Sequence, residues 1–174
     1  MADSADAIHG IAAYLGVKCG KVTYDGNEKI PVMKGKTGTR KGFSTIVKHL
    51  ARAAENHKLI GVSAPEQAVV DQWLEYKTCQ LDRCTTKNDL SPVLQDLNSY
   101  LIDKVYFLNH QLSIIDLALY YGLHNTLASL TFFEKQKYIN LSRWFDNIQQ
   151  DQSIRQSFQR VQFSKTKLYS GSAH

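Results

Sequence analysis

The chain has 174 residues, the length of one domain or of two small ones that share a core, which excludes large multidomain enzymes. Hydrophobic residues make up 43% of the sequence and charged residues 21%, which excludes a disordered or fibrous protein. No apolar run approaches the roughly 20 residues of a membrane span, and the first ten residues lack the basic and then apolar order of a secretory signal. We therefore expect a soluble, cytoplasmic protein without a membrane segment.

Positive charge is concentrated in the first third of the chain. Residues 1–62 contain ten Lys and Arg against five Asp and Glu, whereas the remainder has eleven of each. A basic segment can bind nucleic acid, because Lys and Arg neutralise phosphates and release counterions. No aromatic residue alternates with these charges, as a base-stacking groove requires, so a solvated surface or a face for an acidic protein partner is favoured over direct nucleic-acid binding.

The N-terminal part is predicted to begin with a helix and a hairpin. Residues 2–15 place apolar side chains at helical spacing, and Gly16 follows as a stop. Two extended runs, 21–24 and 29–33, are separated by an Asp-Gly pair at 25–26 that suits a tight turn. Two strands cannot form a domain unaided, so other elements must cover them.

A second helix is predicted over residues 43–54, because its apolar positions follow the spacing i, i+3, i+4, i+7. This helix is expected to cover the small sheet. Gly35, Gly38 and Gly42 precede it and lack the Gly-Lys-Ser/Thr ending of a phosphate loop, so they predict a flexible loop.

Two capping boxes are predicted further along the chain. Ser63 with Glu66, and Ser113 with Asp116, each place a hydroxyl and a carboxylate three residues apart just ahead of an apolar helix. Asp116 among apolar neighbours could instead be a perturbed catalytic acid, but its position in the first helical turn is explained by capping. We therefore assign these four residues a structural role.

Apolar residues at helical spacing predict the buried faces of the remaining helices. These residues are Val69, Trp73 and Tyr76 after the first box; Leu90, Leu94, Leu97 and Leu101 in the next helix; Ile115, Ala118, Leu119, Gly122 and Leu123 after the second box; and Leu141, Trp144, Phe145 and Ile148 in a last helix. The aromatic members could anchor an interface, but their spacing favours the core.

Three segments resemble the glutathione transferase superfamily. Ile30-Pro31-Val32 resembles the strand that opens with a cis-proline in its thioredoxin-like half, although Pro31 could more simply form a turn that ends the hairpin. Residues 42–50 resemble the helix that follows this strand, and residues 113–117 resemble the buried capping box of the helical half. The order of a small α/β unit and then a helical one is also that of the superfamily.

The resemblance implies an α+β, mostly helical, glutathione transferase-like fold. A reduced thioredoxin-like domain would occupy residues 1–60, an all-helical domain of the glutathione transferase C-terminal type residues 63–164, and a polar, frayed tail residues 165–174.

Four further segments resemble the elongation factor 1 epsilon family, small auxiliary scaffold proteins of the multi-aminoacyl-tRNA synthetase complex. In chain order they are QWLEY at 72–76, DLNSYL at 96–101, LYYGLH at 119–124 and SRWF at 142–145. The resemblance implies methionyl-tRNA synthetase, glutamyl-prolyl-tRNA synthetase and other members of that complex as partners. It also implies, for some members, a nuclear location and a role in the DNA-damage response.

The sequence does not favour catalysis. A glutathione transferase activates its thiol substrate with a Tyr, Ser or Cys after the first strand, and the corresponding strand is missing here. The superfamily's Glu-Ser pair at the start of the third helix is replaced by Gly42-Phe43. Cys19, Cys79 and Cys84 stand in no metal-ligand spacing and are interpreted as free thiols, and Cys79 and Cys84, with no His nearby in sequence, as inert ones. No HExxH or GxSxG motif is present, so we expect no catalytic residue, no cofactor and no metal.

Two other functions stay open: a glutathione-dependent transferase whose catalytic hydroxyl is not yet placed, and a tRNA-binding accessory protein that uses the basic N-terminal third.

Four residues are predicted to lie in interfaces. Lys48, Arg52 and Gln72 fall outside the apolar stripes and are expected to face methionyl-tRNA synthetase, by analogy with the pairing of similar folds in the superfamily. Arg143 is expected to point outward near a helix start, where the helix dipole disfavours a cation. The resemblance places an interface arginine here, and it implies a contact with glutamyl-prolyl-tRNA synthetase.

Overall fold

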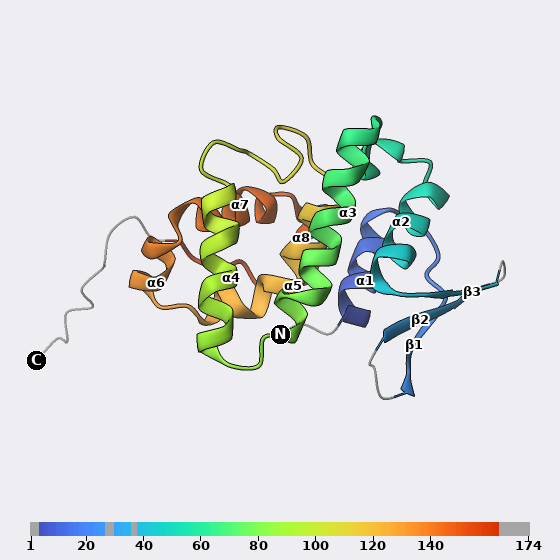
Figure 1. Ribbon diagram of the computed structural model, residues 1–174, viewed down its shortest axis with the longest axis horizontal. Coiled ribbons are helices and arrows are strands. Elements are labelled where there is room, and N and C mark those ends of the chain that lie inside the picture. Colours follow the sequence, from blue (N-terminus) through green and yellow to red (C-terminus); the bar gives the residue numbers. More distant parts are fainter. Residues whose placement is uncertain (1–3, 27–29, 36–37, 164–174) are drawn as a thin grey trace, which may run out of the picture.

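A computed structural model describes residues 4–26, 30–35 and 38–163 (Figure 1). The elements in chain order are α1 (Ser4–Tyr14), β1 (Lys21–Asp25), β2 (Ile30–Gly35), β3 (Gly38–Lys41), α2 (Phe43–Ala53), the 3-10 turn η2 (His57–Ile60), α3 (Ala64–Cys79), the 3-10 turn η3 (Leu81–Arg83), α4 (Lys87–Tyr100), α5 (Ile114–Ser129), α6 (Phe132–Lys137), α7 (Ile139–Gln150) and α8 (Gln152–Arg155). This set of helices and strands confirms the predicted α+β, mostly helical fold class. The predicted tail at 165–174 lies outside the described residues.

The sheet has three antiparallel strands in the order β1-β2-β3. Pairing of Asp25 with Ile30 confirms the hairpin, whose turn at 27–29 lies outside the described residues. Pro31 stands inside β2 opposite Tyr24, and the described residues contain no cis peptide bond. Both interpretations of Pro31, the cis-proline and the turn that ends the hairpin, are therefore wrong.

The predicted flexible loop around Gly35, Gly38 and Gly42 is also wrong, because β3 occupies most of it. Gly35 pairs with Gly38 across the sheet. Gly38 and Gly42 have φ of 114° and 94°, backbone conformations that favour glycine and that here turn the chain into and out of β3. The amide of Gly42 donates to the carbonyl of Pro31 at 2.9 Å, which ties the end of β3 to β2.

The sheet, α1 and α2 lie at one end of the molecule and α4, α6 and α7 at the other, with α3 and α5 between them (Figure 1). Helix α1 packs against α2 and α5. The approach to α5 is close, because a Cβ atom on Gly10 would lie 2.8 Å from the ring of Tyr121. The buried apolar residues of both ends form one continuous core. The domain boundary between residues 60 and 63 stays a prediction.

Four of the described helices, α3, α4, α5 and α6, start at capping boxes. Ser63 and Glu66 form a capping box at α3, and Ser113 and Asp116 form one at α5. Two further boxes, Thr86 with Asp89 at α4 and Thr131 with Glu134 at α6, were not predicted. They use Thr-x-x-acid, the same chemistry with a hydroxyl side chain that carries an additional methyl group on Cβ.

The buried face of α3 is rotated from its predicted position. Trp73 is buried as predicted, but Val69 and Tyr76 are only partly buried, because the buried stripe passes on the other side of Trp73. That stripe consists of Val70, Trp73, Leu74 and Lys77. Helix α5 is buried on almost every side. Within the described ranges, no helix combines the length and apolar character needed to cross a membrane.

Candidate partner-binding surfaces

The first candidate surface lies on α2 and α3 and comprises Lys48, Arg52, Asp71 and Gln72; we call it the α2–α3 surface. Lys48 is not free, since its Nζ lies 2.6 Å from Oδ1 of Asp71 and so joins the two helices. Arg52 and Gln72 are exposed. An exposed ion pair of this kind stabilises a fold by about 0–1 kcal/mol. The surface therefore presents Arg52 and Gln72 beside an ion pair, and not three free side chains.

Two arginines, Arg40 and Arg52, act on His49 beside the α2–α3 surface. The pKa of His49, on the same helix as Arg52, is lowered by burial and by the guanidinium groups of Arg40 and Arg52. His49 therefore favours its neutral form, because a third positive charge beside two guanidinium groups is unfavourable. The basic character of this end of α2 comes from the two arginines.

The second candidate surface surrounds Arg143 on α7. Arg143 is exposed, as predicted from the helical pattern. Its Nη2 donates to the carbonyl of Leu101 at 2.6 Å and to that of Lys104 at 3.0 Å. These carbonyls lie at the C-terminal end of α4, where a cation also complements the helix dipole. The chain itself therefore supplies a reason for arginine here.

Exposed apolar residues flank this arginine. Ile102 is 64% exposed and Val105 46%, and both lie in the loop whose carbonyls hold Arg143. Ile139 is 51% exposed and stands one helical turn before Arg143 on α7. We call Ile102, Val105, Ile139 and Arg143 the α7 surface. Apolar spacing could not identify its three apolar members, because they lie in a loop or outside the buried stripe.

The predicted capping residue Asp116 has more partners than a cap requires. Its carboxylate accepts from the amide and hydroxyl of Ser113 at 2.9 and 2.7 Å, from the amide of Phe107 at 3.0 Å and from Nε1 of Trp144 at 2.9 Å. Burial raises the pKa of Asp116, and the four hydrogen bonds oppose this rise. All four oxygen contacts are internal, so the carboxylate joins α5, α7 and the preceding loop.

Lys77 on α3 is a buried charge that sequence reasoning missed. Its side chain is 1% exposed, and its Nζ lies 2.7 Å from Oδ2 of Asp82 and 3.9 Å from the centre of the Phe43 ring. Helical spacing could have predicted its burial, because Lys77 lies one turn beyond Trp73 and Leu74 on the same face as Val70. The ammonium thus connects α3 with η3 and with the start of α2.

The three thiols differ in surroundings but share a direction of pKa shift. Burial raises the pKa of Cys19 and of Cys84. The hydrogen bond from Cys79 to the carboxylate of Glu75 raises the pKa of Cys79. Raised values keep thiols protonated and weakly nucleophilic at neutral pH. In the part of the chain that the structure describes, no three His, Cys, Asp or Glu residues are grouped as metal ligands.

Comparisons with known proteins show which family the chain belongs to. The family described as nuclear-export cofactor Arc1p matches residues 66–152. Eukaryotic translation elongation factor 1 epsilon-1 of Homo sapiens is 44% identical over 160 residues, which cover 91% of this chain and 92% of that protein. A bifunctional glutamate/proline–tRNA ligase of Cricetulus griseus is 28% identical over 114 residues, which cover 65% of this chain and 7% of the ligase.

Solved structures agree on the fold. A glutathione S-transferase from Pichia kudriavzevii superimposes with a TM-score of 0.71 at 16% identity, over 89% of this chain and 91% of that one. The fold is thus glutathione transferase-like, as the sequence predicted. Sequence identity of 44% over nearly the full length is a far closer relation than a shared fold. The chain belongs to the eukaryotic translation elongation factor 1 epsilon family.

Proposed function

We propose that the chain is a non-catalytic scaffold that supports translation by binding glutathione transferase-like regions of aminoacyl-tRNA synthetases. Its relatives include an elongation factor and a region of a glutamate/proline–tRNA ligase that shares its sequence pattern. Similar folds commonly pair through equivalent elements across a pseudo-two-fold axis. A scaffold with two separate surfaces can join two such partners.

The observation that carries this proposal is the geometry of Arg143. One nitrogen of its guanidinium is held by two carbonyls, while Nε and Nη1 have no hydrogen-bond partner among the described residues. The side chain is thus fixed in place with two donors open to a partner carboxylate. Exposed Ile102, Val105 and Ile139 supply apolar area around it. A pre-positioned arginine within apolar residues is typical of an interface centre.

We assign the α7 surface to the glutamate/proline–tRNA ligase and the α2–α3 surface to methionyl-tRNA synthetase. The ligase region similar to this chain would bring the same elements to the contact. The α2–α3 surface carries the exposed Arg52, and Arg40 of β3 lies close enough to act on the same histidine, which suits an acidic partner face. Cytoplasmic location accompanies this function, with a nuclear pool as a further proposal.

The absence of catalysis is supported by what occupies the start of α2. Gly42 is the N-cap residue of α2 and has no side chain that could form a capping hydrogen bond. Phe43, which follows it, is buried and packs under the ammonium of Lys77. A ring at this position cannot bind the charged γ-glutamyl end of glutathione. Loss of such charged hydrogen bonds costs about 1.5–3 kcal/mol each, which removes most specific affinity.

The decisive experiment measures binding of the ligase region by calorimetry. We expect Arg143→Ala to weaken binding by about 2 kcal/mol or more, because a pre-positioned donor pair is lost. Arg83→Ala, which removes an exposed arginine from η3, is the matched control and should bind like wild type. Thermal melts of both variants separate folding from binding. Wild-type affinity in Arg143→Ala would contradict the assignment of the α7 surface.

A further inference from the structure

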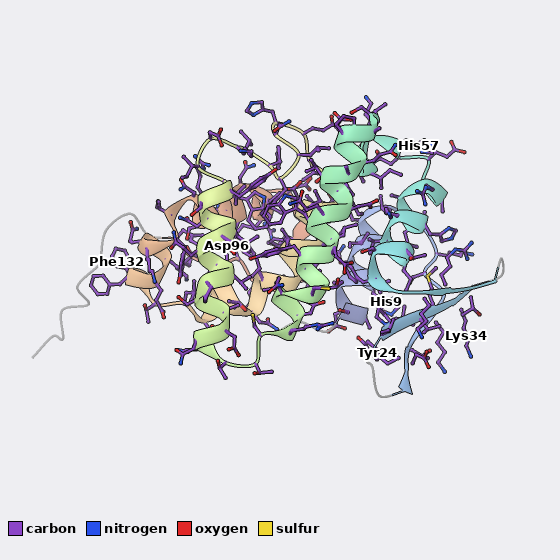
Figure 2. All side chains as sticks on the ribbon, viewed as in Figure 1. His9, Tyr24, Lys34, His57, Asp96 and Phe132 are labelled. Atoms are coloured by element: carbon purple, nitrogen blue, oxygen red, sulfur yellow. The ribbon has the colours of Figure 1, made fainter. Side chains whose placement is uncertain are left out.

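A groove of about 420 Å³ runs between α6, α7 and the segment after α8. Its walls are apolar at Phe132, Ile139 and Phe163, and its polar lining includes Lys135, Arg143 and Asp146. Phe132 lies at the opposite end of the molecule from Tyr24 and Lys34 of the sheet (Figure 2). The groove is therefore remote from the basic hairpin and from the α2–α3 surface.

The charges at the groove favour an anion. Lys135 donates from Nζ to the carbonyl of Gln162 at 3.1 Å and lies 5.3 Å from the centre of the Phe163 ring, so its ammonium is fixed at the rim. Arg143 brings the second cation. Lys135 remains a donor with capacity for further bonds, since an ammonium has three protons.

The acid in the lining is already engaged. Asp146 Oδ1 accepts from the side-chain amides of Gln149 and Gln150 at 2.8 and 3.1 Å, and Nη2 of Arg160 lies 3.9 Å away. These bonds orient the carboxylate but leave its negative charge in the lining. The groove then presents two cations against one acid beside an apolar floor, a net positive charge that complements an apolar group with a carboxylate beside it.

The groove is continuous with the α7 surface, because Ile139 and Arg143 belong to both. Ile139 is 51% exposed, so the groove opens toward that surface. Pockets for free small ligands usually enclose most of the ligand, whereas an open groove beside an interface receives a side chain of the partner. The open wall therefore favours a side chain that belongs to a partner.

We propose that the partner bound at the α7 surface inserts one apolar side chain, with an acidic residue next to it, into the groove between α6 and α7. The apolar group packs on Phe132, Ile139 and Phe163, and the carboxylate meets Lys135 and Arg143. This inference rests on the proposed function, since it names the anchor of the same contact. It assigns α6 and the segment at 162–163 to binding.

The test uses two adjacent phenylalanines of α6. Phe132 lines the groove, whereas Phe133 is 67% exposed and is absent from the groove lining. We expect Phe132→Ser to weaken binding of the ligase region about tenfold or more in calorimetry, and Phe133→Ser to stay within about twofold of wild type. Equal affinities of the two variants would overturn the proposal.

Val105→Ser separates this inference from the proposed function. Val105 belongs to the α7 surface and not to the groove lining. If Val105→Ser weakens binding while Phe132→Ser does not, the α7 surface stands and the groove anchor is wrong. If neither variant weakens binding although the wild-type chain binds the ligase region, the groove anchor is wrong and the contact lies away from Val105, whereas a wild-type chain that does not bind the ligase region at all contradicts the proposed function.

A small probe keeps the test valid even if Phe132→Ser does not fold. On the full wild-type chain, 4-phenylbutyrate carries a ring and a carboxylate, and 4-phenyl-1-butanol lacks the charge. We expect the acid to shift the amide resonances of Lys135 and Gln162 and to compete with the ligase region, and the alcohol to do so severalfold more weakly. No shift at these residues overturns the proposal. Much tighter probe binding by a chain that ends at Phe163 would also overturn it, because the natural occupant would then be the chain's own end.

Discussion

Asp116 shows how one residue joins distant parts of the helical core. Ser113 is its capping partner, but Phe107 and Trp144 come from a loop and from α7. Both carboxylate oxygens are saturated by donors that have no access to water. Asp116 accepts hydrogen bonds from three segments of the chain. It should therefore contribute more to the stability of the fold than an exposed helix cap does.

We expect Asp116→Ala to lower the free energy of unfolding by about 3 kcal/mol or more, since each buried donor left without a partner costs about 1–3 kcal/mol. Asp96→Ala is the control, because Asp96 is exposed and accepts one bond, from the hydroxyl of Tyr76. It should cost about 1 kcal/mol or less. Urea denaturation measures both variants. A wild-type midpoint for Asp116→Ala would assign Asp116 a role other than structure.

Replacing Lys77 and replacing Asp82 should change the free energy of unfolding by different amounts, although the two residues form one ion pair. Lys77 is 1% exposed, whereas the Asp82 side chain is 24% exposed. We expect Asp82→Asn to cost about 3 kcal/mol, because it leaves a buried ammonium without its carboxylate. Lys77→Met should cost less, since Asp82 then turns to water while the methionine fills the space over Phe43. Equal unfolding free energies of the two variants in urea would contradict this account.

At the scale of elements, four of the helices within the described residues start at capping boxes with a carboxylate. Hydrogen bonds from backbone amides and hydroxyls lower the pKa of Glu66, Asp89 and Glu134 below their ordinary values. Their stabilisation is therefore complete above the unfolded pKa and is lost as pH falls through the folded pKa. Asp116 has the opposite sign, because its pKa is raised and its folded form holds the proton to higher pH.

Because these pKa shifts have opposite signs, the pH dependence of one chain's stability mixes them. The useful measurement is therefore the difference in unfolding free energy between wild type and a variant. Glu66→Gln keeps an acceptor but cannot ionise. We expect wild type to be more stable than this variant near pH 6, and the gap in unfolding free energy to close as pH falls through the lowered folded pKa of Glu66, where the carboxylate gains its proton. Chemical denaturation across this range measures the gap. The contribution of Asp116 to the pH dependence cancels, because both chains contain this residue. A gap that widens toward acid would contradict the assigned direction.

At the scale of the whole molecule, the two surfaces lie on separate elements, so their partners should bind independently. We expect Arg52→Glu to weaken binding of methionyl-tRNA synthetase and to leave ligase binding unchanged, and Arg143→Ala to do the reverse. Lys58→Glu, an exposed change in the same basic third, is the control for net charge. Size-exclusion chromatography of the three mixtures reports both contacts. Loss of both partners from one variant would contradict separate surfaces.

Glutathione binding distinguishes a scaffold from a transferase. We expect no saturable heat from glutathione in calorimetry at concentrations up to about 1 mM, a range that detects affinities of roughly −4 kcal/mol or tighter. The reason is the buried Phe43 ring at the start of α2. Saturable binding would restore the transferase alternative. A steep dependence of tRNA binding on salt would instead favour the tRNA-binding alternative.

Much of this fold could be predicted from the sequence, because apolar spacing and capping motifs indicate helices locally. Apolar spacing identified α1, α2, α5 and α7, and Ser-x-x-acid identified two of the four capping boxes. Both signals act within one or two helical turns, so they do not depend on the rest of the chain. The same holds for the exposure of Arg143, which follows from the stripe on the opposite side of α7.

Tertiary structure alone decided which polar groups meet. The carbonyls that hold Arg143 lie about forty residues earlier in the chain, and Lys48 finds its acid on the next helix. The strand β3 forms because β2 offers it an edge, which overrides the glycines that predicted a loop. The groove exists only where α6, α7 and Phe163 come together. A sequence pattern encodes each element's own periodicity, whereas these features arise from contacts between elements that no local spacing specifies.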